Sequence, residues 1–310
     1  MNQSFKTAIV GAGMIGSSMA CLFAGNGIPV TVKTSRREAV AEKVATYYAD
    51  LVAEKLMTEA QVAACTKLIT YTTEYEDIAD AEVVFECVVE KLDIKQTIYA
   101  ALAKTCKNLK AIVSSSSAIS PADLANGTEC PEKIMVGHPY NPPHLVPCVE
   151  LVKNDFTDAE SLKAVYGLLE YCGREVCTMN RPAPGFIANR LQHALYREAM
   201  YMVEQGICGP EDIDKCIRSS WGPRYTSIGL FEHFDYAGLD LIANIETYLY
   251  PDLCDTKEVH PSIKLRLEEG NLGYKTGHGV YDWTKYDMDA FRKKTTAPYL
   301  QFFNWKLPEA

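Results

Sequence analysis

The chain has 310 residues, of which 47% are hydrophobic and 23% charged, and its formal net charge is -9. This length predicts two domains with a sizeable core, and the composition is typical of soluble globular proteins. The acidic balance and the lack of a basic stripe argue against nucleic acid as a partner. No run of about 18 apolar residues is present, so we expect no membrane-spanning segment and no membrane partner.

The cysteines and the N-terminus indicate a reducing compartment. Eleven cysteines are present, an odd number, and no two of them form a CxxC pair. The first residues, MNQSFKTAIVGAG, pass directly into an apolar strand pattern without a charged leader or cleavage site. We therefore expect reduced thiols, no metal site and a cytoplasmic location.

The first half of the chain alternates short strand patterns with helical ones. Strands are predicted in TAIVGAG, PVTVKT, AEVVFECVVE, KAIVSSSSA, KIMVGH, VPCVELV and REVCTMN. Helices are predicted over 14–26, 38–56, 91–106 and 158–172, and another begins where Ser120 can cap and Pro121 can occupy the first helical position. This alternation predicts an α/β fold with a largely parallel, doubly wound sheet.

The segment NRPAPGF at 180–186 breaks the alternating pattern, and the strand signal fades after it. FIANRLQHALYREAMYMVEQG and PEDIDKCIRSSW both read as amphipathic helices. We therefore predict one domain over 1–183 and a mainly α-helical C-terminal domain over 184–310. The last stretch, RKKTTAPYLQFFNWKLPEA, carries aromatic residues that are available to dock on a neighbouring subunit.

A glycine-rich loop follows the first predicted strand. Gly11, Gly13 and Gly16 form G-x-G-x-x-G between that strand and a helix, with Met14 and Ile15 inside the motif. The three glycines suit a tight turn, a close approach of pyrophosphate to the backbone, and close helix–strand packing. The helix N-terminus offers free N–H groups to phosphates. The alternative is a purely structural turn, but the context favours a dinucleotide-binding Rossmann domain.

The residues after the second strand indicate which dinucleotide binds. An acidic residue that holds the ribose 2′-hydroxyl of NAD is expected roughly 20 residues past the glycines. Thr34 occupies that position, and Ser35, Arg36 and Arg37 follow it. A hydroxyl and two guanidinium groups suit a 2′-phosphate, so NADP(H) is favoured over NAD(H). The alternative is that the arginines belong to a solvated helix start.

The stretch GHPYNPPHLVPCVELV, Gly137 to Val152, contains a candidate acid–base pair. His138 follows an apolar strand, and the carboxyl ends of strands are where ligands bind in open α/β sheets. Glu150 lies on a second strand, and the proline-rich loop between them can bring the two side chains together. A carboxylate would orient the imidazole as a base for a hydroxyl proton. A core histidine with an ion-pair partner is the competing interpretation.

Five motifs, in the right order over nearly the whole chain, resemble those of the 3-hydroxyacyl-CoA dehydrogenase superfamily. They are VVEKLDIK, SSSSA, GHPYNPPHLVPCVELV, PGFIANRL and EGNLGYKTGHGVYDW. The resemblance implies an oxidoreductase, with a C-terminal domain that serves substrate binding and homodimerisation. It also assigns catalytic residues by motif: Ser117, His138, Glu150 and Asn189.

Other residues are assigned by the same resemblance. Glu90 and Lys95 match positions on the nicotinamide ribose side, and Asn141 follows the dyad histidine as it does in the family. Each also has a structural interpretation, such as a helix cap for Glu90 or a solvated charge for Lys95. His144 has no partner of metal-ligand spacing, so we expect it to contact the substrate instead.

Two features point to a branch of the superfamily and to a substrate. HPYNPPHLVP resembles the branch of L-gulonate 3-dehydrogenase, lambda-crystallin and L-carnitine dehydrogenase, which act on free hydroxy acids. Arg224 stands where the acyl-CoA enzymes tend to be apolar, and it could clamp a substrate carboxylate. A surface ion pair is the alternative for Arg224.

The sequence therefore predicts an NADP(H)-dependent dehydrogenase acting on the 3-position of a small 3-hydroxy or 3-keto acid. A 3-hydroxyacyl-CoA dehydrogenase is the second candidate, although the helical region 47–67 has few basic residues to contact CoA. A non-enzymatic dinucleotide-binding protein is the third, and the retained Ser117, His138, Glu150 and Asn189 argue against it.

Overall fold

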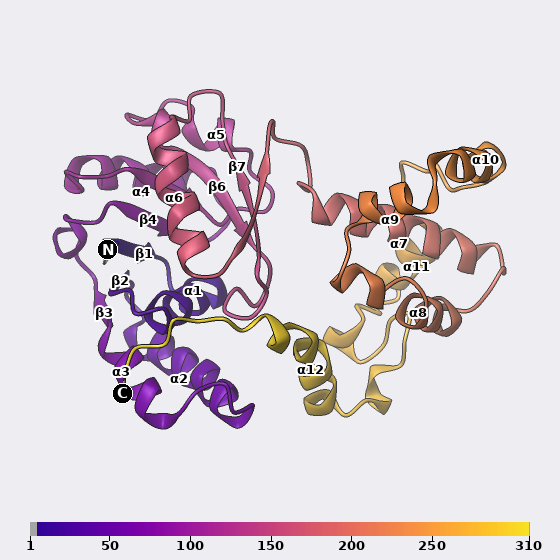
Figure 1. The fold of residues 1–310 in the computed structure, drawn as a ribbon, viewed down its shortest axis with the longest axis horizontal. Coiled ribbons are helices and arrows are strands. Elements are labelled where there is room, and N and C mark those ends of the chain that lie inside the picture. The colour runs from indigo at the N-terminus through magenta and orange to yellow at the C-terminus, as the bar shows by residue number, and fades with distance from the viewer. Residues whose placement is uncertain (1–4, 310) are drawn as a thin grey trace. The chain divides into compact units, whose positions relative to one another are not determined.

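The computed structural model describes residues 5–309 and divides into two compact units (Figure 1). One unit runs to Ile187 and takes in the segment from Arg292 onward, and the other is Ala188–Phe291. This division differs from the predicted domains, which assigned the whole of 184–310 to the helical domain. The physical reason lies in Trp305, which is buried against the first unit where Gly25 leaves room for its ring. The backbone N–H of Lys306 also donates to Asn26 Oδ1 at 2.9 Å.

A single sheet of eight strands forms the centre of the first unit. Its strand order is β3-β2-β1-β4-β5-β6-β7-β8, and all neighbours are parallel except β6 and β7, which are antiparallel. The strands are β1 (Thr7–Val10), β2 (Val30–Lys33), β3 (Ile69–Thr72), β4 (Val83–Glu86), β5 (Ala111–Ser114), β6 (Ile134–Pro139), β7 (Cys148–Val152) and β8 (Glu175–Met179).

Helices account for most of the remaining structure. The α-helices are α1 (Met14–Gly25), α2 (Arg37–Ala53), α3 (Glu59–Lys67), α4 (Leu92–Thr105), α5 (Pro121–Ala125), α6 (Ala159–Tyr171), α7 (Ala188–Glu204), α8 (Pro210–Ser219), α9 (Leu230–Ala237), α10 (Leu239–Leu249), α11 (Pro261–Glu268) and α12 (Met288–Thr296). The 3-10 helices are η1 (Glu76–Ile78), η2 (Pro131–Lys133), η3 (Pro223–Thr226), η4 (Tyr274–Thr276), η5 (Trp283–Lys285) and η6 (Ala297–Phe302).

The sheet is covered by helices on both faces, which confirms the predicted doubly wound α/β fold. Helices α1, α2 and α6 pack on one face with Phe23, Tyr48 and Leu168 in their core. Helices α4 and α5 pack on the other face, where Tyr99 and Leu124 are fully buried. Every residue of β1, β4 and β5 is buried, and their sequences are mainly apolar rather than alternating, because both faces of these strands are covered.

Strand β3 was not predicted. Ile69 is the single buried residue of β3, and its remaining residues are Thr70, Tyr71 and Thr72. Such a short polar edge strand has almost no hydrophobic signal of its own. The helical region predicted over 47–67 is divided between the end of α2 and a separate helix, α3. Helix α3 begins at a capping box between Thr58 and Gln61. The predicted cap of α5 is confirmed, because the Ser120 side chain accepts a hydrogen bond from the Asp123 N–H.

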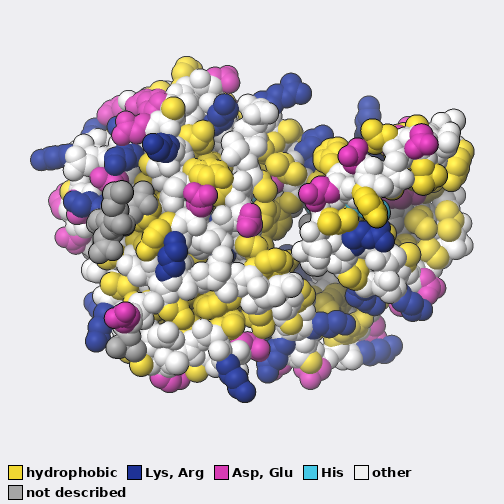
Figure 2. Space-filling view, viewed as in Figure 1, with side chains coloured by type: hydrophobic (Ala, Val, Ile, Leu, Met, Phe, Trp, Pro, Cys, Tyr) yellow, Lys and Arg dark blue, Asp and Glu magenta, His cyan; other side chains and the backbone are white. Residues whose placement is uncertain are grey.

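The second unit is helical, as predicted, but its apolar residues are poorly covered. Of the hydrophobic side chains in Ala188–Phe291, all within the described residues, Met200 alone is buried. Phe231 and Tyr236 are 88% and 91% exposed. Figure 2 shows hydrophobic side chains on the surface of this unit, including the region of α10. Within residues 5–309, none of the helices has the length and hydrophobicity needed to span a bilayer.

Candidate active site

The glycine-rich loop lies at the carboxyl end of β1, as the motif predicts. Gly11 has a φ of +109°, and a Cβ there would lie 2.5 Å from the Cys87 carbonyl oxygen. A Cβ on Gly16 would lie 2.3 Å from the Gly11 carbonyl oxygen. Gly13 differs, because a Cβ there would have no protein neighbour closer than 4.0 Å. Gly11 and Gly16 are therefore required by packing, whereas Gly13, the cap residue of α1, leaves the space open for a ligand.

A cavity of about 500 Å³ opens beside this loop. Its walls come from the glycine loop, the end of β2 and the segment after β4. It is lined by Val10, Gly11, Ala12, Gly13, Lys33, Thr34, Ser35, Arg36, Thr73, Tyr75, Cys87, Val88, Val89 and Ile98. These residues fit a dinucleotide, because the cavity joins a helix N-terminus to the end of the second strand.

The charges in this cavity are positive. Lys33 and Arg36 line it, and its lining residues include no Asp or Glu. The Thr34 hydroxyl accepts the Arg36 N–H at 3.0 Å, which turns the chain after β2. Lys33, which lies 4.1 Å from the centre of the Tyr75 ring, was not singled out from the sequence. Lys33 is the last residue of β2, and this position at the carboxyl end of a strand could have indicated a ligand contact from the sequence.

Six of the residues assigned to the cofactor from the sequence do not line this cavity: Met14, Ile15, Gly16, Arg37, Glu90 and Lys95. Arg37 begins α2 and lies over the Tyr71 ring at 5.8 Å. Met14, the first residue of α1, is 51% exposed, and Ile15 packs against the core of the sheet. The helical period explains the difference, because it points successive side chains of α1 and α2 in different directions.

His138 and Glu150 are brought together by the sheet itself. They lie directly opposite each other in the antiparallel pairing of β6 with β7. His138 Nδ1 is 2.8 Å from Glu150 Oε2, and the other carboxylate oxygen accepts the Ile187 N–H at 2.7 Å. Glu150 is 1% exposed and His138 is 9% exposed. The carboxylate therefore orients the ring at Nδ1 and leaves Nε2 as the nitrogen available to a ligand.

Two aromatic rings pack around His138. Tyr140 lies edge-on with ring centres 5.4 Å apart, and Phe186 is tilted against the histidine at 5.4 Å. Phe186, which was not predicted to be in the site, has a positive φ and is buried. Asn141 follows Tyr140 and is exposed. The histidine is thus held by apolar contacts as well as by Glu150.

Glu90 and the serine run meet at the carboxyl ends of β4 and β5. The Ser116 hydroxyl donates to Glu90 Oε1, and the backbone N–H groups of Ser117 and Ala118 donate to the same oxygen, each at 3.2 Å. Burial alone would raise the pKa of Glu90, but Ser116, Lys95 and the Ala118 N–H outweigh it and lower the pKa. Glu90 therefore stays ionised, and the Ser117 side chain is left exposed.

A buried carboxylate beneath Glu90 was missed in the sequence. Glu86, at the end of β4, is 0% exposed, and Lys95 Nζ lies 2.8 Å and 2.9 Å from its two oxygens. The hydroxyls of Tyr99 and Ser114 donate to Glu86 at 2.9 Å and 2.7 Å. An acidic residue in the apolar run VVFE was the available signal, because a buried charge needs compensating partners.

The prediction that Lys95 lines the cofactor site is wrong. Its side chain is fully buried, paired with Glu86 and 3.3 Å from Glu90 Oε2. Since the ammonium is enclosed between two carboxylates, it supports Glu90 from beneath instead of facing a ligand.

The prediction that His144 contacts the substrate is also contradicted. His144 is 4% exposed and stacks on the Tyr47 ring. Ser18 Oγ accepts the His144 backbone N–H at 2.9 Å and lies 2.8 Å from His144 Nδ1. Burial, reinforced by the charge of Arg174, lowers the pKa of His144 to about 4. His144 therefore remains neutral and holds the proline-rich loop against α1.

Asn189 and Arg224 belong to the second unit. Asn189 is the second residue of α7 and is partly buried. Arg224, in η3, is exposed, with Nη1 3.0 Å from both ring nitrogens of His233. Their assignments to the substrate remain predictions.

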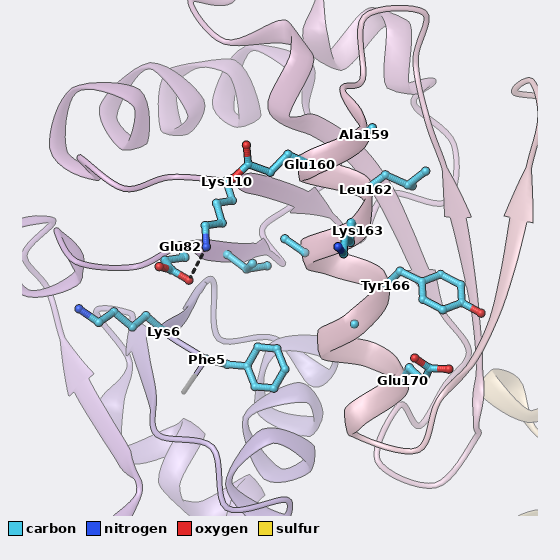
Figure 3. Close-up of a pocket in the computed structure, with 13 residues that line it drawn as sticks. Phe5, Lys6, Glu82, Lys110, Ala159, Glu160, Leu162, Lys163, Tyr166 and Glu170 are labelled. Carbon is cyan, nitrogen blue, oxygen red and sulfur yellow. Dashed lines mark hydrogen bonds and ion pairs between the residues drawn. The ribbon is translucent and has the colours of Figure 1, made fainter. Parts of the chain in front are cut away.

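A cavity of about 760 Å³, larger than the one at the glycine loop, lies elsewhere in the first unit (Figure 3). Its lining includes Phe5, Lys110 and Tyr166, with Glu82 and Lys110 paired at 3.1 Å. Phe5, Glu82 and Lys110 precede β1, β4 and β5, so this cavity lies at the amino ends of the strands. Ligands of open α/β sheets bind at the opposite ends, so the glycine-loop cavity is the candidate site. Within residues 5–309, no cluster of three or more His, Cys, Asp or Glu could hold a metal ion.

The chain is similar in sequence and structure to several known dehydrogenases. The 3-hydroxybutyryl-CoA dehydrogenase of Clostridioides difficile is 28% identical over 90% of this chain and all of its own length. The L-carnitine dehydrogenase of Streptomyces coelicolor is 35% identical over 75% of this chain and 73% of its own. The crystal structure of an NAD+-dependent dismutase, 5-formyl-3-hydroxy-2-methylpyridine 4-carboxylic acid 5-dehydrogenase, has a TM-score of 0.81 at 25% identity, covering 96% of this chain and 97% of its own.

Two family models match consecutive parts of the chain. The NAD binding domain of 3-hydroxyacyl-CoA dehydrogenase matches residues 6–181, and the C-terminal domain of 3-hydroxyacyl-CoA dehydrogenase matches residues 185–283. With the doubly wound sheet and the glycine loop, these matches establish a nicotinamide dinucleotide as the class of cofactor. The chain belongs to the 3-hydroxyacyl-CoA dehydrogenase superfamily.

Proposed function

We propose that the protein is an NADP(H)-dependent dehydrogenase acting on the 3-position of a small 3-hydroxy or 3-keto acid, with His138 and Glu150 as its acid–base pair. The observation that carries this proposal is the buried contact between His138 Nδ1 and Glu150 Oε2 at 2.8 Å. The pair lies toward the carboxyl end of β6, on the same edge of the sheet as the glycine loop.

The geometry supports a defined proton transfer. Glu150 keeps a proton on Nδ1, so Nε2 is the basic nitrogen that removes the proton from a substrate hydroxyl. The imidazolium that forms is stabilised by the buried carboxylate, whose other oxygen is held by the Ile187 N–H. A bound nicotinamide dinucleotide supplies the hydride acceptor or donor. In the reductive direction, the imidazolium returns the proton to the carbonyl oxygen.

Ser117 is proposed to bind the substrate oxygen. Its backbone N–H is anchored by Glu90 Oε1 at 3.2 Å, while its side chain is exposed. Glu90 and the Lys95–Glu86 pair thus position the loop that carries Ser117. Asn189 and Asn141 are proposed to complete the contacts to the substrate.

The preference for NADP(H) rests on the charges around the end of β2. A 2′-phosphate would meet Lys33, Ser35 and Arg36 in a cavity whose lining residues include no carboxylate. The NAD+-dependent relative shows that NAD(H) is the relevant alternative in this superfamily.

Binding titrations with NADPH and NADH test this preference. We expect NADPH to bind more tightly, and Arg36→Ala to weaken NADPH binding by roughly 10- to 150-fold, since one charge-assisted contact contributes about 1.5–3 kcal/mol. Arg37→Ala is the matched control, because Arg37 does not line the cavity. Equal affinities for the two cofactors, or equal effects of the two substitutions, would refute the proposal.

A 3-hydroxyacyl-CoA dehydrogenase is the second candidate, supported by the 3-hydroxybutyryl-CoA dehydrogenase of C. difficile. Arg224 supports the free acid instead, because its exposed guanidinium group could hold a carboxylate. A panel of 3-hydroxy and 3-keto acids, each free and as CoA thioester, separates the two. Turnover of thioesters alone would replace the free-acid proposal.

A homodimer is part of the proposal. The second unit exposes Phe231, Tyr236 and Leu239 by 88%, 91% and 65%. Apolar surface of this extent is typical of protein interfaces. Light scattering at micromolar protein concentration measures the molar mass in solution, and the mass of a monomer would contradict the proposed homodimer.

A further inference from the structure

Two cysteine thiols lie beside each other on β7 and β8. Cys148 Sγ and Cys177 Sγ are 4.0 Å apart, the single thiol–thiol contact recorded among residues 5–309. The register pairs Cys177 directly with Glu150, and Cys148 precedes Glu150 by two residues on the same strand. Because alternate residues of a strand share a face, both thiols lie on the face of the sheet that carries Glu150.

The two thiols differ in their surroundings. Cys177 is exposed on the edge strand β8, whereas Cys148 is only partly exposed. Burial raises the pKa of Cys148 to about 12, and the neighbouring Cys177 and Glu150 reinforce the shift. Cys177 is therefore the thiol that a solute meets first, and Cys148 is held within reach behind it.

We propose that Cys148 and Cys177 form a modification site at which a hydroperoxide produces an intramolecular disulfide. No step of the proposed dehydrogenase reaction uses either thiol, and the contact brings together residues on two separate strands.

The chemistry balances with hydrogen peroxide as the oxidant. The Cys177 sulfur attacks one peroxide oxygen, the O–O bond breaks, and the products are a sulfenic acid and water. The Cys148 sulfur then attacks the sulfenic sulfur, forms the S–S bond and releases the hydroxyl group as a second water. Overall, two thiols lose two electrons and two protons, and one peroxide becomes two waters.

Disulfide formation should also affect the acid–base pair, a consequence that rests on the proposed function. The sulfurs must approach from 4.0 Å to a bonded distance of about 2.0 Å. Since Cys177 is the register partner of Glu150 and Cys148 lies two residues before Glu150 on the same strand, this movement displaces the carboxylate that orients His138. We expect oxidation to lower the rate by roughly tenfold or more.

The first experiment measures the modification without reference to activity. The full-length protein is treated with hydrogen peroxide, the remaining thiols are alkylated, and the peptides are mapped by mass spectrometry. We expect a disulfide between Cys148 and Cys177 in the wild type. In Cys148→Ser, we expect a sulfenic acid on Cys177 that dimedone traps.

Cys216→Ser is the matched control. Cys216 is exposed like Cys177, but its sulfur lies 3.9 Å from the Ser220 hydroxyl instead of beside a second thiol. This variant should form the disulfide as the wild type does. Thermal unfolding shows whether each variant folds. If Cys148→Ser does not fold, Cys177→Ser replaces it as the variant that cannot form the disulfide, because Cys177 lies at an exposed position. Retention of both thiols in the wild type, or a disulfide between two chains on a non-reducing gel, would overturn the proposal.

The second experiment compares rates before and after oxidation and after reduction by dithiothreitol. We expect a reversible loss in the wild type and in Cys216→Ser, and no loss in Cys177→Ser. If the disulfide forms but the rate is unchanged, the modification site stands and its link to Glu150 is wrong. If untreated protein turns over no substrate, the proposed function fails independently of the disulfide.

Discussion

Each compact unit contains one buried histidine whose Nδ1 lies against a glutamate. In the first unit, His138 Nδ1 is 2.8 Å from Glu150, and in the second, His260 Nδ1 is 2.9 Å from Glu204. The histidines are similarly buried, at 9% and 8% exposure. By the distance and by the burial of the histidine alone, the two pairs are indistinguishable.

Their surroundings differ. Glu150 and His138 face each other across paired strands, at the edge of the sheet where ligands bind. Glu204 ends α7, and its Oε1 accepts the backbone N–H and the hydroxyl of Ser262 at the start of α11. His260 precedes α11, and its Nε2 is buried with no hydrogen-bond partner among the described residues.

This comparison shows that a histidine–carboxylate pair is not by itself a catalytic site. The second pair ties the start of α11 to the end of α7, and its histidine presents no nitrogen to solvent. Only the first pair stands at the edge of the sheet that also carries a dinucleotide cavity.

The largest expected difference is in catalysis. We expect His138→Gln to lower kcat by about 10²- to 10⁴-fold, because it removes the proposed base, with NADPH affinity unchanged. His260→Gln should keep a near-wild-type kcat in the fraction that folds. Steady-state rates and a cofactor titration on both variants measure this.

An equal loss of kcat in His138→Gln and His260→Gln would contradict the assignment of different roles to the two pairs. An unchanged kcat in His138→Gln would show that His138 is not the base. A wild type without any turnover would instead favour the non-enzymatic dinucleotide-binding protein over the proposed dehydrogenase.

The pair of His260 and Glu204 should instead contribute to the free energy of unfolding. The Ser262 hydroxyl, followed by His260, lowers the pKa of Glu204 from 4.5 to about 2. Glu204→Gln should therefore reduce the free energy of unfolding at pH 7 by about 1–3 kcal/mol, with the rate of the folded enzyme retained. Because the folded pKa is below the unfolded one, this stabilisation is lost as pH falls from 4.5 toward 2.

Denaturant titrations at neutral and acidic pH measure this effect. Glu246→Gln is the control, because Glu246 is partly exposed and its side chain bonds only to its helical neighbour Tyr250 among the described residues. A loss in Glu204→Gln no larger than in this control would contradict the structural role of the second pair.

His144 provides a smaller test, since it is buried against Ser18 without a carboxylate partner in its recorded contacts. Its pKa falls from 6.5 to about 4, so the unfolded chain binds the proton first as pH decreases. The free energy of unfolding should therefore fall between pH 6.5 and pH 4, by at most about 1.4 kcal/mol per pH unit.

His144→Gln should flatten this pH dependence, while His193→Gln, at an exposed position, should leave it unchanged. An unaltered slope in His144→Gln would mean that another group produces the dependence.

Much of the fold and part of the site were predictable because their signals are local. The glycine spacing predicted the turn after β1, and alternating patterns predicted seven of the eight strands that the sheet contains. The His138–Glu150 contact was predictable because both residues lie in strands joined by one short loop.

The incorrect predictions involve contacts between distant parts of the chain. His144 looked available as a substrate contact until Ser18, 126 positions away, was found on its ring. The segment from Arg292 onward looked like part of the helical domain, but Lys306 bonds to Asn26 across 280 positions. No local pattern encodes such a partner.

The amino-acid sequence by itself thus determined the doubly wound sheet, the glycine loop and the contact between His138 and Glu150. Their causes are hydrophobic periodicity, backbone sterics and short loops, which act over a few residues. Only the tertiary structure decided that Lys95 is enclosed by Glu86, that Cys148 meets Cys177, and that the second histidine–glutamate pair caps a helix. Burial and partner choice for a polar side chain depend on which distant segments pack around it, and packing exists only once the chain has folded.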